Sequence, residues 1–125
     1  MISSIVFSAS HFNSDGYCLG MIRIKKGEDP MTASNWKKID RPLFTGSPDR
    51  GIWSPGHNSF FMSPDGSERW LAYHAYTVPW SQTEGFGNAR RQTFALPFTL
   101  DKDEIPIFGI PASVGSYHRA PSGEE

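Results

Sequence analysis

The chain has 125 residues, and its 12 Lys and Arg against 13 Asp and Glu give a formal net charge of −1 at pH 7. Proteins that bind nucleic acids or anionic membranes usually carry an excess of positive charge, and this chain has none, so we expect neither as a partner. A neutral small molecule or a sugar is the better expectation for a ligand. No run reaches the roughly 18 apolar residues that a membrane-spanning helix needs. With 12 Gly, 10 Pro, 9 Phe, 4 Tyr and 4 Trp, the composition favours short strands joined by tight turns.

The first seven residues lack the basic start and long apolar centre of a secretion signal, so the sequence leaves the compartment unknown. The chain instead begins inside an expected strand, as a fragment of a larger domain would. The single Cys18 excludes an internal disulfide and, in a strand-like stretch, is expected to pack as a small hydrophobe.

The first expected unit is a hairpin. Residues 4–10 and 17–24 alternate or run apolar, and the turn-rich residues 11–16 separate them. Residues 25–30 then break the strand, and residues 32–36 are predicted to form one short helical turn. This second stretch is interpreted as a connector.

A second hairpin is predicted from residues 57–62 and 69–76. Between them, Pro64, Asp65 and Gly66 supply a preset φ, a side-chain acceptor and a position for positive φ, in the order that a turn requires. A long loop at 77–87, a strand at 89–96, a polar turn at 101–104 and a last short strand at 105–109 follow, and the tail from residue 116 is predicted to fray.

These short strands indicate an all-β fold, and the pattern alone does not choose between a sandwich and a propeller. Because a propeller blade takes about 40 to 50 residues, the chain would supply two to three blades at most. The propeller interpretation therefore requires that the chain be part of a larger domain.

Three segments resemble, in order and spacing, the C-terminal region of family 43 glycoside hydrolases. They are Pro-Gly-His-Asn-Ser-Phe at 55–60, Ser-Pro-Asp-Gly at 63–66 and Trp-Leu-Ala-Tyr-His-Ala at 70–75. The similarity extends upstream through residues 7–10, 17–20 and 29–37, and downstream through 89–92 and 105–111. The resemblance implies a partial β-propeller, about the last two blades of five, over residues 1–115, with residues 116–125 as a tail.

The resemblance also implies inverting hydrolysis of O-glycosyl bonds in arabinose- or xylose-containing glycans of the plant cell wall, as in arabinofuranosidases and β-xylosidases. Three carboxylates carry this chemistry in the family. By the resemblance all three lie in earlier blades, so no catalytic residue is assigned here. The chain is expected to be inactive alone and to need the N-terminal blades as its partner. Family members are often secreted.

Two side chains are candidates for the site by resemblance. His57 matches a histidine at the propeller axis that binds calcium or a water cluster, although such a histidine is also commonly satisfied by structural contacts alone. Arg90 matches an arginine that reaches a substrate hydroxyl or catalytic carboxylate. Alternation along a strand places Arg91 on the opposite face, so we select Arg90.

Aromatic residues in loops are candidates for sugar stacking, since large exposed rings need a core or a ligand to cover. Trp80 is assigned to substrate binding, with Trp53 and Phe86 also in loop or turn segments. Tyr73 and His74 are interpreted mainly as core packing. Two rival hypotheses stay open: a non-catalytic carbohydrate-binding or interaction module that uses Trp53 and Trp80, and a non-functional remnant of a truncated gene.

Overall fold

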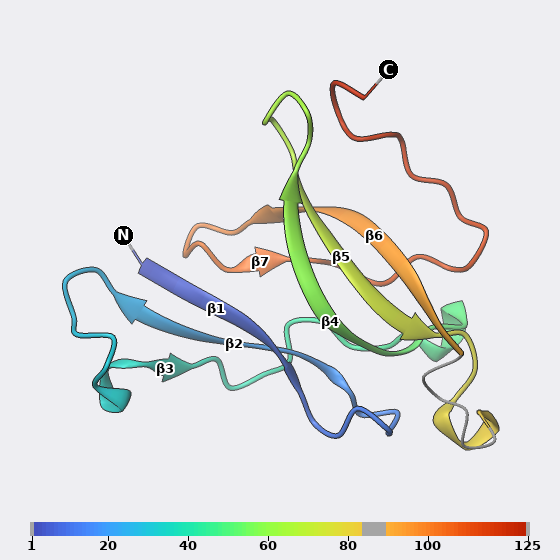
Figure 1. The fold of residues 1–125 in the computed structure, drawn as a ribbon, viewed down its shortest axis with the longest axis horizontal. Coiled ribbons are helices and arrows are strands. Elements are labelled where there is room, and N and C mark those ends of the chain that lie inside the picture. Colours follow the sequence, from blue (N-terminus) through green and yellow to red (C-terminus); the bar gives the residue numbers. More distant parts are fainter. Residues whose placement is uncertain (1, 84–89, 125) are drawn as a thin grey trace.

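The computed structural model describes residues 2–83 and 90–124, which form two antiparallel sheets (Figure 1). The first sheet has the order β1 (Ile2–Ala9), β2 (Cys18–Lys25), β3 (Lys37–Lys38). The second has the order β4 (Trp53–Met62), β5 (Arg69–Tyr76), β6 (Arg91–Leu100), β7 (Pro106–Ile107). The described residues also form three single 3-10 turns: η1 (Ala33–Asn35), η2 (Pro48–Arg50) and η3 (Trp80–Gln82). Within the described ranges no helix is long and apolar enough to span a membrane.

Both predicted hairpins are confirmed. β1 and β2 pair from Ile2 opposite Lys25 to Ala9 opposite Cys18, and β4 and β5 pair around the predicted turn. The carboxylate of Asp65 accepts the backbone N–H of Ser67 at 3.0 Å, which is the turn chemistry expected of that residue.

The strand predicted at 89–96 is shifted toward the C-terminus and runs through Pro97 to Leu100. A proline is tolerated there because β7 pairs with β6 only at Thr99 and Leu100, so Pro97 has no strand on its outer side. Proline marks an edge position in this sheet rather than the end of the strand.

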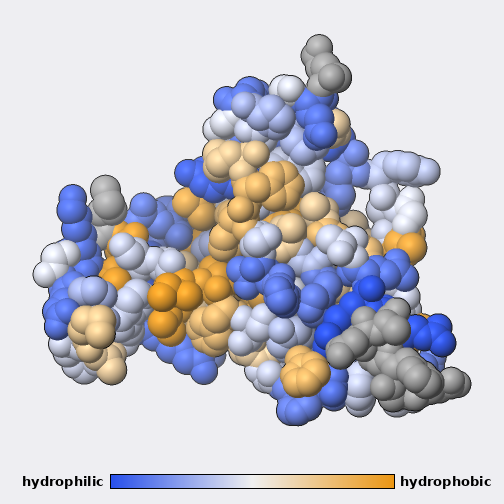
Figure 2. Space-filling view, viewed as in Figure 1, coloured by the Kyte–Doolittle hydropathy of each residue, from blue (hydrophilic) through white to orange (hydrophobic). Residues whose placement is uncertain are grey.

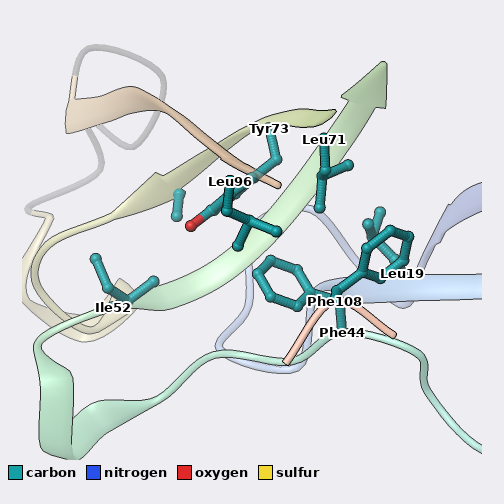
Figure 3. Packing of buried hydrophobic residues seen from close by; sticks show 8 residues of the cluster. Leu19, Phe44, Ile52, Leu71, Tyr73, Leu96 and Phe108 are labelled. Atoms are coloured by element: carbon teal, nitrogen blue, oxygen red, sulfur yellow. The ribbon is translucent and has the colours of Figure 1, made fainter. Parts of the chain in front are cut away.

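One apolar core joins the two sheets (Figure 3). Its buried members are Leu19, Phe44, Ile52, Leu71, Tyr73, Ala75, Leu96 and Phe108. The connector after β3 contributes Phe44, whose ring meets Tyr73 edge to face at 4.9 Å between centroids. The backbone of the connector is held by Leu19, whose N–H donates to the carbonyl of Phe44 at 3.0 Å. Burial raises the pKa of Tyr73 to about 12, so its phenol stays neutral.

The C-terminal residues predicted to fray instead contact the turn between β4 and β5. Arg119 forms an ion pair with Glu68, and the backbone N–H of Ser122 donates to the same carboxylate at 3.0 Å. Ser122 also donates its hydroxyl to Asp65. These hydrogen bonds hold the pKa values of both carboxylates below their ordinary range, with the contact from Ser122 as the largest cause in each.

We predict that Leu71→Ala lowers the free energy of unfolding by about 2 to 5 kcal/mol, because Leu71 is fully buried and the vacated volume cannot be filled. Met31→Ala is the matched control, since Met31 is 89% exposed and should change stability by less than about 0.5 kcal/mol. Urea denaturation of both variants measures the difference, and equal stabilities would contradict this description of the core.

Candidate functional site

The candidate site lies at the end of the second sheet where β4 and β6 both begin. Trp53 at the start of β4 and Arg91 at the start of β6 are the residues paired with Tyr76 of β5. Because both strands run antiparallel to β5, their first residues meet at the same end of the sheet.

Five side chains converge at this end, and we call them the histidine cluster: Tyr17, His57, His74, Tyr76 and Arg91. The centres of the His57 and His74 rings lie 5.4 Å apart, and the ring of Tyr17 stacks on that of His74 at 6.1 Å. The Arg91 guanidinium carbon lies 5.3 Å from the centre of the Tyr76 ring. The cluster combines residues from β4, β5, β6 and the loop before β2.

The Pro-Gly-His segment has its composition because the backbone there passes directly against an aromatic ring. A Cβ atom on Gly56 would overlap the ring of Tyr17, so only glycine fits. The pairing of β4 with β5 is irregular on both sides of Gly56, and His57 has a φ of 53° in the left-handed region. Its N–H donates to Ser8 Oγ at 2.8 Å, which fixes the turn of β4 against β1.

The electrostatics of the cluster favour a neutral His74. Burial lowers the pKa of His74, and the nearby charge of Arg91 and the proximity of His57 lower it further. Neither His74 Nδ1 nor the Tyr76 hydroxyl has a hydrogen-bond partner, although both atoms are buried in the described part of the chain. An unpaired buried polar atom costs about 1 to 3 kcal/mol. A water molecule or a polar group from beyond the described residues would complete this site.

The guanidinium that reaches the cluster belongs to Arg91. It packs between the rings of Tyr76 and Phe12, at 5.3 Å and 5.5 Å from their centres, and donates to the carbonyl of Phe12 at 3.4 Å. Arg90 precedes β6 and is exposed. The role of Arg90 in substrate binding stays a prediction, but the side chain beside His74 is that of Arg91, which alternation had placed on the other face. The pairing of Arg91 with Tyr76 is the signal that the sequence analysis lacked.

Trp80 adjoins the cluster through Tyr76. The two rings are 6.0 Å apart and tilted, and the Trp80 side chain is half-buried. Its backbone N–H donates to the carboxylate of Asp15 at 2.6 Å, so η3 is tied to the loop between β1 and β2. Trp53 is half-buried within β4, and Phe86 lies outside the described residues. The stacking role of Trp80 stays a prediction.

The residues around His57 do not by themselves fit a calcium ion. No group of three or more His, Cys, Asp or Glu side chains is close enough to share a metal in the ranges that the structure describes. Calcium prefers six to eight oxygen ligands, whereas the immediate ring neighbour of His57 is another imidazole. Oxygen ligands would have to come from water or from groups beyond the described residues.

Comparison with known proteins decides the family. The model for glycosyl hydrolases family 43 matches residues 4–106. The chain belongs to this family. An extracellular exo-α-(1→5)-L-arabinofuranosidase of Streptomyces avermitilis is 33% identical over 111 residues, and an α-L-arabinofuranosidase 43 of Humicola insolens is 29% identical over 111 residues.

Solved structures of the family confirm the predicted all-β, partial-propeller fold. An α-L-arabinofuranosidase from Lactobacillus brevis superposes with a TM-score of 0.82 and 28% identity, over 93% of this chain. A thermostable family 43 glycoside hydrolase superposes with a TM-score of 0.74 and 27% identity, over 96% of this chain. The chain spans 35% of each of these structures and 23% of each curated relative. It is therefore a short part of the larger family 43 domain.

We predict that Gly56→Ala lowers the free energy of unfolding by about 1 to 3 kcal/mol, because the added methyl group forces the ring of Tyr17 to move. The control is the same substitution in a Tyr17→Ala background, where the overlap is gone and the cost should shrink. Thermal unfolding of the four proteins in this cycle measures the coupling. Additive effects would show that Tyr17 does not constrain Gly56.

We also predict that the His74 imidazole titrates below the ordinary value of about 6.5, as followed by nuclear magnetic resonance. The unfolded chain then binds this proton more readily than the folded chain. Stability should therefore fall as pH drops below about 6.5 and should be independent of this group above it. His74→Gln should remove this part of the pH dependence, and a midpoint at or above the ordinary value would contradict the description.

Proposed function

We propose that the chain contributes part of the substrate-facing wall of a glycoside hydrolase domain that cleaves α-L-arabinofuranosides from plant cell-wall glycans. The observation that carries the proposal is the histidine cluster, in which His74 and Tyr76 bury polar atoms that no side chain among residues 2–83 and 90–124 satisfies. A sugar hydroxyl, a water molecule or a carboxylate of the remaining domain could pair with either atom. The names of the curated relatives support arabinofuranose as the sugar.

The described carboxylates with clear partners have structural tasks. Asp29, Asp65 and Asp101 each accept the backbone N–H of the second residue after them, as turn residues do. Glycoside hydrolysis needs two carboxyl groups on opposite sides of the scissile bond. We therefore assign the general acid and the general base to the remainder of the domain.

In this proposal the remainder of the domain carries out the acid–base chemistry, and the histidine cluster binds and orients the sugar. The Arg91 guanidinium supplies a fixed positive charge and N–H donors that suit a sugar hydroxyl or a catalytic carboxylate. A neutral His74 supplies one donor and one acceptor and adds no second charge beside Arg91. The side chain of His57 is exposed at the edge of the histidine cluster and is proposed to order water there. A calcium ion would bind at His57 only with oxygen ligands from elsewhere.

A binding module without catalysis is less well supported. Stacking platforms present a free aromatic face, yet Trp53 and Trp80 are both half-buried, and Trp80 packs against Tyr76. The Trp80 ring borders the histidine cluster through Tyr76, and Trp53 is paired with Tyr76 along the sheet. Trp80 is accordingly proposed as a rim residue of the same sugar site.

The purified chain should show no turnover of nitrophenyl α-L-arabinofuranoside, because it lacks the pair of carboxyl groups. Joined to the remainder of a family 43 domain, it should support hydrolysis, and Arg91→Ala should lower kcat/KM about a hundredfold. Arg90→Ala is the matched control for Arg91→Ala, and it tests the sequence-based assignment of Arg90 to substrate binding. Turnover by the chain alone that a single Asp or Glu substitution abolishes would overturn the proposal.

A further inference from the structure

The turn between β4 and β5 carries a bound segment of the same chain, residues 118–123, which we call the C-terminal segment. This segment returns from β7 to the turn, as Figure 1 shows, and lies beyond residues 4–106, the range of the family match. In Figure 2 the surface is mainly hydrophilic at the end of the molecule where the two meet. No residue of the segment belongs to the buried core cluster, so polar contacts carry most of the interaction.

Glu68 is the centre of these contacts. Its carboxylate accepts the indole N–H of Trp70 at 3.1 Å and the backbone N–H of Ser122 at 3.0 Å, and it also forms an ion pair with Arg119. The side chain of Arg119 is 72% exposed, whereas that of Glu68 is 20% exposed. Because an ion pair with so exposed a partner contributes little, the two N–H donors to this charged acceptor contribute more. One carboxylate thus joins β5 to the C-terminal segment.

Asp65 and Ser122 are hydrogen-bonded in both directions. The backbone N–H of Asp65 donates to the carbonyl of Ser122 at 3.4 Å, and the hydroxyl of Ser122 donates to the carboxylate of Asp65. Gly123 follows with a φ of 85°, and a Cβ atom there would lie 3.0 Å from the backbone nitrogen of Asp65. A side chain at this position would strain the backbone and crowd the turn. These contacts set the register, with Arg119 at Glu68, Ser122 at Asp65 and glycine next.

The C-terminal segment also contacts an aromatic ring beside the turn. The ring of His118 meets that of Trp70 edge to face at 6.2 Å between centres. Phe61 stacks on the same indole at 5.9 Å, and Trp70 is only 5% exposed. Because Trp70 contacts both Glu68 and His118, its indole N–H reports whether the segment is bound.

We propose that the turn between β4 and β5 is a binding surface for an extended peptide segment with Arg and Ser three positions apart, and that residues 118–123 occupy it as a reversible latch. Local structure held by solvent-exposed hydrogen bonds and few buried apolar contacts opens at a small fraction of the global unfolding free energy. Residues 118–120 are exposed and 121–122 are half-buried, so the latch opens while the core stays folded. The latch does not depend on the activity proposed above.

Ser122→Ala tests the latch, and Ser116→Ala is the matched control. The first substitution removes the hydroxyl that donates to Asp65, whereas Ser116 is exposed and precedes the bound residues. Trypsin cleavage after Arg119 and hydrogen exchange of the backbone N–H of residue 122 are both measured in the intact chain. We expect both rates to rise about tenfold in Ser122→Ala, because a hydrogen bond to a charged acceptor is lost, and to stay unchanged in Ser116→Ala. Equal rates in the two variants would overturn the latch.

The binding surface is tested separately with a synthetic peptide of residues 116–124. It is added to a chain that carries Arg119→Ala and Ser122→Ala, in which the turn itself is unaltered. The peptide should move the magnetic resonance signals of the Trp70 indole N–H and the Asp65 N–H toward their positions in the unmodified chain, and a peptide with the same two substitutions should not. Absence of this shift at millimolar peptide would overturn the surface. Cleavage after Arg119 that slows as the concentration of the unmodified chain rises would also overturn the proposal, since the segment would then bind a second copy.

Discussion

The close approach of β4 to the ring of Tyr17 at Gly56 is the constraint on which the rest of the site depends. Tyr17 belongs to the loop of the first sheet and Gly56 to the second, and the space between them excludes a Cβ atom. Because Tyr17 also stacks on His74, this one contact sets the distance between the sheets and the position of an imidazole. The bulged course of β4 then turns His57 toward His74.

Polar contacts between the loop of the first sheet and the second sheet reinforce that approach. The hydroxyl of Ser54 donates to the carbonyl of Ser14 at 2.7 Å, and Asp15 accepts the N–H of Trp80. Arg91 meets the same loop at Phe12. Each bond is modest, at about 1 kcal/mol, but together they hold a loop at the site end of β4 and β6. The cluster thus forms at a junction of two sheets, where side chains from distant parts of the sequence are held together.

The features that local chemistry determines were predictable, and those that register and long-range contacts determine were not. Asp65 indicates its turn because its carboxylate accepts the backbone N–H of Ser67. The hairpin formed by β4 and β5 around this turn follows from the alternation of apolar and polar residues. Which of Arg90 and Arg91 reaches the cluster depends on the residue at which β6 begins. The pairing of Arg91 with Tyr76 determines that residue. Residues 116–125 have turn-like composition, and nothing local indicates that Arg119 meets Glu68, which is 51 positions away.

The first strand, β1, and the histidine cluster are linked through Ser8. This residue lies near the end of β1, and its hydroxyl accepts the N–H of His57, a backbone group in the strained left-handed region. Among the described strands β1 pairs only with β2, so the position of Ser8 depends on that ladder. A shift of β1 would move Ser8 and, through this hydrogen bond, the backbone of His57. The geometry of the histidine cluster is therefore coupled to the position of β1, because the residue that accepts the N–H of His57 stands on that strand.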